Sequence, residues 1–150
     1  MINGKKSIYQ REYKGTLGYE LPDFEHQLFE LSSLDVFDAE VYHQLYGDEP
    51  GWEEDLTELL EAFIQTLPEE TTVIKNAHEN HDWKKVEFMA HKMKGGCLSV
   101  GLDRLTIACQ FLERYARAGY SDKLEKLYEQ MLGTIDATLP EVTKWVKTHH

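Results

Sequence analysis

Apolar side chains recur at spacings of three and four over most of the chain, which is the pattern of amphipathic helices that bury one face. The pattern predicts a short helix from Asp35 to Gly47 and four long helices over about 51–79, 82–100, 103–118 and 121–146. The alternation of β-branched residues that is typical of strands appears nowhere over a useful length. Because the connections are short, the sequence predicts an all-α fold, an up-down antiparallel four-helix bundle with a short extra N-terminal helix.

Glycine, proline and polar residues predict where these helices end or bend. Gly47 is expected to stop the first helix in the left-handed conformation, and Gly101 and Gly119 end later ones. Asp82 and Ser121 are expected to cap helices, Pro68 to bend or briefly break one, and Pro140 to kink another. The side chains expected to face the core are as follows. The short helix contributes Phe37, Val41 and Leu45, and the 51–79 helix contributes Trp52, Leu56, Leu59, Leu60, Phe63, Leu67, Ile74 and Ala77. The 103–118 helix contributes Leu105, Ala108, Cys109, Leu112 and Ala116, and the 121–146 helix contributes Leu124, Leu127, Tyr128, Met131, Ile135, Leu139, Val142 and Trp145 or Val146.

The first 33 residues differ from the rest, because glycines interrupt a mixture of charges and tyrosines that has no sustained period. We therefore divide the chain into a flexible lead-in or linker, residues 1–33, and a helical bundle, residues 34–150. Within the lead-in, residues 21–33 are expected to lie on the bundle through Leu28, Phe29 and Leu31.

The charge of the chain excludes several classes of function. With 16 Lys and Arg against 27 Asp and Glu, the net charge is −11, which opposes binding to the phosphate backbone of nucleic acids. No apolar stretch approaches the roughly 20 residues of a membrane helix, and no apolar segment of a secretory signal follows Met1. We therefore expect a cytoplasmic protein without membrane insertion. Cys97 and Cys109 lie within predicted helices and are expected to be buried thiols.

The third long helix departs from a generic bundle helix. At 100° per residue its core face comprises Val86, Met89, Ala90, Met93, Cys97 and Val100. His91 points away from that face and is therefore predicted to be exposed. Its neighbours on the outward side are Lys84, Phe88, Gly95 and Leu98, with Glu87 and Lys94 towards one flank.

These neighbours suggest a docking surface around the histidine. Gly95 and Gly96 each cost about 1 kcal/mol relative to alanine in a helix, and Gly95, one turn after His91, leaves room for another backbone. Lys94 can place an ammonium near an anion bound on the ring. Phe88 and Leu98 add apolar area that is typical of an interface. The surrounding basic residues are Lys84, Lys85, Lys92 and Lys94.

Simpler interpretations stand beside this one. An exposed histidine on a helix is usually a solvated polar residue, and a run of lysines is usually a solvated face. Phe88 and Leu98 could be covered by the N-terminal segment. His78 and His81 have a spacing that suggests metal binding, but they straddle a helix end and lack further ligands, so no metal site is expected.

Residues 91–101, HKMKGGCLSVG, resemble the signature of histidine-containing phosphotransfer (HPt) domains: a histidine, Lys-Gly three residues later, a small or apolar run, and a glycine. The similarity extends through Leu102, Leu105, Cys109, Leu112 and Glu113, and more loosely over 35–147. It is greatest to the C-terminal HPt domain of anaerobic-type hybrid sensor kinases, and residues 21–36 weakly resemble the linker that precedes such tails.

The resemblance implies a phosphocarrier that has no catalytic centre of its own. His91 would accept a phosphoryl group from a receiver-domain aspartate and pass it to another receiver, in a hybrid kinase or a response regulator. By the same resemblance the reactive atom is Nε2, Glu113 orients the ring, with Gln110 as second choice, and Lys94 steadies the phosphoryl oxygens. The residues expected to take part in docking are Lys84, Lys85, Phe88, Lys92, Gly95 and Leu98.

The cofactor, partner and oligomer expectations follow from the same reading. No cofactor of its own is implied, and Mg²⁺ is expected in the partner receiver. We expect a monomer, because the bundle contains its own core, and a tether at the inner membrane if the chain is the tail of a hybrid kinase. Dimeric phosphotransferases with a degenerate ATPase domain need more than 150 residues. The alternative is a non-phosphorylating helical adaptor that binds receiver domains; loss of the histidine would mark it, whereas His91 is present.

Overall fold

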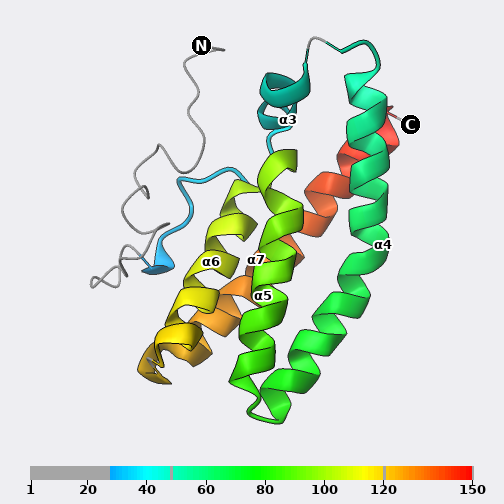
Figure 1. Ribbon diagram of the computed structural model, residues 1–150. Helices are drawn as coiled ribbons and strands as arrows, with labels where there is room; N and C mark the ends of the chain where they lie inside the picture. The colour runs from blue at the N-terminus through cyan, green and yellow to red at the C-terminus, as the bar shows by residue number, and fades with distance from the viewer. Residues whose placement is uncertain (1–27, 48, 120, 150) are drawn as a thin grey trace.

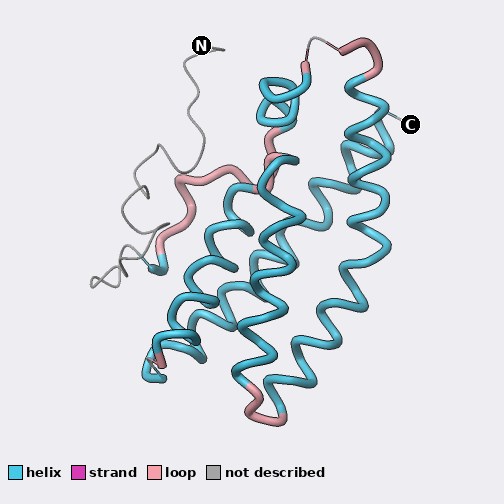
Figure 2. Tube along the Cα trace, in the orientation of Figure 1, coloured by secondary structure: helices cyan, strands magenta, loops and turns pink. Residues whose placement is uncertain are grey.

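The computed structural model describes residues 28–47, 49–119 and 121–149, apart from the side chain of Ser121, and the regular structure of these residues is entirely helical (Figures 1 and 2). This confirms the predicted all-α class. The helices are α3 (Ala39–Tyr46), α4 (Trp52–Glu79), α5 (Trp83–Cys97), α6 (Asp103–Ala118) and α7 (Leu124–His149), with short 3₁₀ turns η2 (Leu98–Val100) and η3 (Ser121–Lys123).

The four long helices form a bundle in which each packs against two others. Helix α5 contacts α4 and α6, and α7 contacts α6 and α4, so the four enclose a common core. The short helix α3 lies at one end of the bundle, against η2 and α4 (Figure 1). Among the described residues no helix is long and apolar enough to span a membrane.

Most helix ends follow the predicted capping chemistry. The Asp82 carboxylate accepts a hydrogen bond from the backbone N–H of Lys85 at 3.1 Å, which caps α5. Gly101 and Gly119 have φ of 81° and 79°, the left-handed conformation that favours glycine. The side chain of Ser121 lies outside the described residues. The last predicted turn of α5 tightens into the 3₁₀ turn η2 before Gly101.

One prediction about a helix end is wrong. Gly47 ends α3 with φ of −72°, not in the left-handed region. Glycine is needed there because a Cβ would meet the backbone carbonyl of His43. Helix α4 continues through Pro68, so of the two alternatives the break is absent and the bend stays a prediction. Helix α7 continues through Pro140, where the kink also stays a prediction. Both prolines are exposed, so the carbonyl that each leaves without a helical partner is on the solvent side.

The core contains most of the predicted stripe residues, with two clear exceptions. All six predicted core residues of the 82–100 helix are buried. Leu45 and Leu59, however, remain 57% and 48% exposed. On α3 the buried side chain is Tyr42, and on α4 Leu56 and Leu60 are buried in the core.

Helix α6 is buried on more of its circumference than one apolar stripe predicts. Ile107 and Phe111, absent from the predicted stripe, are both fully buried. Residues 28–34 explain this, since Leu28, Leu31 and Leu34 are buried and Figure 1 shows the segment beside α6. The segment is held by hydrogen bonds from Arg104 Nε to the Leu34 carbonyl at 3.0 Å and from Gln130 Nε2 to the Leu28 carbonyl at 2.8 Å. The predicted contact of Leu28, Phe29 and Leu31 with the bundle is confirmed.

Candidate functional site

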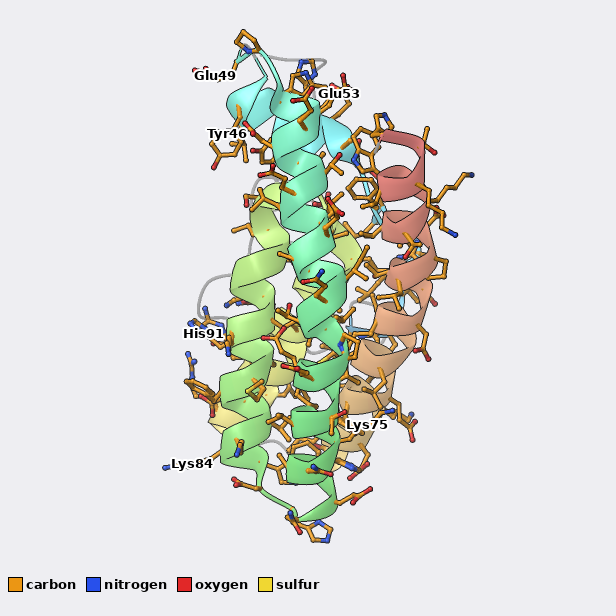
Figure 3. The ribbon with its side chains drawn as sticks, turned by 90° about the vertical axis from the view of Figure 1, so that its right-hand side faces the viewer. Tyr46, Glu49, Glu53, Lys75, Lys84 and His91 are labelled. Carbon is orange, nitrogen blue, oxygen red and sulfur yellow. The ribbon has the colours of Figure 1, made fainter. Side chains whose placement is uncertain are left out.

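His91 projects from the exposed side of α5, as the helical period predicts. Because Met89, Ala90 and Met93 turn into the core, the imidazole is directed outward. Its side chain is 62% exposed. Figure 3 shows His91 and Lys84 on the same side of the bundle, so the ring stands on a face that a second protein can reach.

A buried carboxylate from the neighbouring helix holds one ring nitrogen. Glu113 on α6 is only 2% exposed, and its Oε2 lies 3.1 Å from His91 Nδ1. The prediction that Glu113 faces the helix of His91 is therefore confirmed. Such a contact fixes the orientation of the ring from its buried side and leaves the opposite nitrogen, Nε2, towards solvent.

The ionisation of Glu113 decides which nitrogen can react. Burial by itself raises the pKa of this carboxyl, but hydrogen bonds and charge from Lys94 and His91 outweigh burial and hold the pKa below its ordinary value. An ionised carboxylate can only accept hydrogen bonds. We therefore assign the proton of the neutral ring to Nδ1, which leaves the lone pair on Nε2.

Lys94 links Glu113 to Gln110. Lys94 Nζ donates to Glu113 Oε1 at 2.8 Å and to Gln110 Oε1 at 2.6 Å, and its side chain is 13% exposed. Gln110 is almost completely buried. Its predicted position at a more solvated angle is wrong, because α6 is covered on both sides. Its amide oxygen accepts the hydrogen bond from Lys94.

Arg117 belongs to the same group of residues and was missed by sequence reasoning. Its Nη2 donates to Glu113 Oε2 at 2.6 Å, and its Nε donates to Glu87 Oε2 on α5 at 3.0 Å. The side chain is half exposed. The available signal was the spacing of four residues from Glu113, which places the two side chains on one face of α6.

The predicted docking residues surround His91 on the outer surface. Lys84, Lys85 and Gly95 are exposed, and Phe88 is 62% exposed, so no described part of the chain covers it. A Cβ on Gly95 would have no neighbour within 4 Å. The two remaining residues differ in setting: Lys92 is exposed with its Nζ 3.9 Å from Glu70, and Leu98 is half-buried in η2.

An open hollow of about 250 Å³ lies beside the ring. It is lined by Lys84, Glu87, Phe88, His91 and Arg117. Two cations, the Glu87 carboxylate and the imidazole therefore meet in one depression that is open to solvent. Such a site can hold a small anionic group on the imidazole.

No metal site emerges from the described residues, in which no group of three or more His, Cys, Asp or Glu side chains could hold a metal ion. His78 instead lies 2.8 Å from a Glu125 oxygen and stacks on Tyr128 with ring centroids 3.8 Å apart. Cys97 and Cys109 are buried free thiols, and burial raises the pKa of both.

Comparison with known proteins gives one finding that covers this site. A family model described as Hpt domain matches residues 58–143, which include His91, Lys94, Gln110, Glu113 and Arg117. Searches of curated proteins and of solved structures give no significant match.

Proposed function

Because the chain belongs to the Hpt domain family, whose function is histidine phosphotransfer in phosphorelays, we propose that His91 accepts a phosphoryl group from the aspartyl phosphate of one receiver domain and transfers it to the aspartate of another. One observation carries the choice of residue. His91 is exposed, and its Nδ1 is held by the buried, ionised carboxylate of Glu113, so that Nε2 is the nitrogen available to a partner.

The transfer balances without a proton leaving the ring. The Nε2 lone pair attacks phosphorus and the N–P bond forms, while the bond between phosphorus and the bridging oxygen of the aspartyl phosphate breaks and releases the receiver's carboxylate. The ring keeps its Nδ1 proton and becomes positively charged. Glu113 stabilises that charge through the hydrogen bond that it already accepts. The reverse sequence returns the phosphoryl group to an aspartate.

The receiver supplies the rest of the chemistry in this proposal. Phosphoryl transfer depends mainly on positioning and on stabilising charge on the phosphoryl oxygens, and Mg²⁺ with a lysine of the receiver would provide that stabilisation. The present chain would contribute the nucleophile, its orientation by Glu113 and a surface on which the receiver docks.

Docking is proposed to use the exposed surface around His91. Phe88 would supply apolar contact, Gly95 would allow close approach of the receiver backbone, and basic side chains would pair with acidic groups around the receiver's phosphorylation site. The lysines that we assign to this role are Lys84, Lys85 and Lys92. The proposal includes a monomer whose four long helices run up and down, in the cytoplasm, either free or as the tail of a hybrid sensor kinase.

The test is transfer of radiolabelled phosphate from a phosphorylated receiver in the presence of Mg²⁺. The native chain should acquire a label that is labile in acid and stable in base, and His91→Gln should acquire none. Binding of several receivers to the native chain without any transfer of label would contradict phosphotransfer and would support the adaptor alternative.

A further inference from the structure

The lysine beside His91 is already engaged by other side chains. The resemblance to HPt domains assigns the phosphoryl oxygens to Lys94, but its ammonium donates to Glu113 at 2.8 Å and to Gln110 at 2.6 Å. Only 13% of the side chain is exposed. Two of the three N–H donors of the ammonium are therefore in use inside the protein, and a move of Lys94 away from Glu113 would weaken the contacts that orient the ring.

Arg117 is placed differently. Its guanidinium bonds to the same Glu113 oxygen as the His91 ring, so the two side chains are neighbours. A guanidinium has five N–H donors, and the bonds to Glu113 and Glu87 use two of them. Half of the side chain is exposed, and it lines the hollow that also contains His91.

We propose that Arg117 is the residue of this chain that binds the phosphoryl group on His91, whereas Lys94 acts on Glu113 and positions the ring. This inference rests on the proposed function of His91. The charged groups that face the hollow are Lys84 and Glu87 from α5 and Arg117 from α6, with Glu113 beneath them. Two carboxylates hold the guanidinium at the edge of the hollow before phosphorylation, and three of its five N–H donors are left for an anion there.

The expected consequence is a longer-lived phosphohistidine. Hydrolysis requires water to attack phosphorus while the N–P bond breaks, which releases inorganic phosphate and restores the imidazole. A guanidinium bound to the phosphoryl oxygens stabilises the phosphorylated protein and disfavours their protonation.

The experiment uses the full chain phosphorylated with potassium phosphoramidate, whose N–P bond breaks as the new one forms, with ammonia as the leaving group. Phosphorus NMR follows the titration of the phosphoryl group and the decay of its signal. In Arg117→Ala the titration midpoint should rise by about half a pH unit or more. The half-life should fall by about two- to fivefold, as for loss of a partly exposed ion pair.

Three further variants separate this role from a structural one. Arg117→Lys should give intermediate values, because it keeps the charge but not the planar set of donors. Lys75→Ala removes a charge from a side chain on α4 that Figure 3 shows away from His91, and it should match the native chain. Lys94→Gln should shift the midpoint less than Arg117→Ala.

The outcomes distinguish this inference from the proposed function. If the native chain gives no phosphohistidine that depends on His91, both fail. If the native chain is phosphorylated but Arg117→Ala keeps the native midpoint and half-life, or Lys94→Gln produces the larger shift, only the role of Arg117 is overturned.

Discussion

At the scale of single residues, Glu113 organises the site. A buried carboxylate is costly unless it is paired, and this one accepts hydrogen bonds from His91, Lys94 and Arg117. The same bonds orient the imidazole and keep the carboxylate ionised. Orientation of the nucleophile and stability of the fold are therefore linked through one side chain.

This link predicts a dependence of stability on pH. The pKa of Glu113 is lower in the folded protein than its ordinary value of 4.5, so near pH 4 the unfolded chain binds more protons. The stabilisation is fully present well above pH 4.5 and is lost as the pH falls through the folded-state pKa. Glu113→Gln should therefore flatten the acid side of the stability curve, measured by urea unfolding from pH 3 to 7.

The variant should also cost about 1–3 kcal/mol near neutral pH, because it leaves Lys94 without its carboxylate. Glu129→Gln, at an exposed position on α7, is the control for loss of one surface carboxylate. Equal pH curves for the Glu113 variant and the native chain would show that the carboxylate is not stabilised by its partners.

Sequence reasoning located His91 and Glu113 but not the bonds around them. The helical period gave the outward direction of His91, because that direction depends only on which residues of α5 are apolar. The period of α6 placed Gln110 wrongly, because it did not reveal that α6 is covered on both sides. It put Arg117 on the same face as Glu113, but the contact of Arg117 with Glu87 depends on how α5 and α6 are rotated against each other.

At the scale of elements, α5 contains two glycines that the isolated fold does not need. A Cβ on Gly95 or Gly96 would meet no atom within 4 Å, and neither glycine is among the residues with positive φ. In a helix each costs about 1 kcal/mol relative to alanine. Their presence beside His91 fits a surface that a partner backbone approaches closely.

Gly95→Ala should therefore stabilise the free protein by about 0.5–1 kcal/mol and yet slow phosphotransfer from a receiver. Gly133→Ala is a matched control, because Gly133 is an exposed helical glycine on α7 with equally open surroundings. It should give the same stabilisation without a change in transfer rate. Thermal unfolding and the label-transfer assay measure the two effects; unaltered transfer in Gly95→Ala would remove Gly95 from the docking surface.

At the scale of the whole molecule, residues 28–34 complete the core. The sequence pattern accounts for only one buried face of α6, and residues 28–34 lie beside this helix with Leu28, Leu31 and Leu34 buried. The contacts of Arg104 and Gln130 with backbone carbonyls of this segment fix its course. Part of the stability of the bundle therefore resides outside its long helices.

Leu31→Ala should destabilise the protein by about 2–4 kcal/mol, as for a large-to-small change in a core. Leu45→Ala is the matched control, since that side chain is 57% exposed and should change stability by less than about 1 kcal/mol. Chemical denaturation of both variants measures the difference. Similar values for the two would mean that residues 28–34 do not contribute to the folded core.

The sequence by itself determined the helical class, most helix ends, the burial of one face of α5 and the exposure of His91. These features depend on local periodicity and on capping and turn residues that act within one helix. Only the tertiary structure decided that Arg117 joins the site, that Lys94 bonds to Glu113 and Gln110, that Leu45 and Leu59 remain outside the core, and that α6 is covered on both sides. Each of these follows from the relative rotation of packed helices and from a segment distant in sequence, which local patterns do not encode.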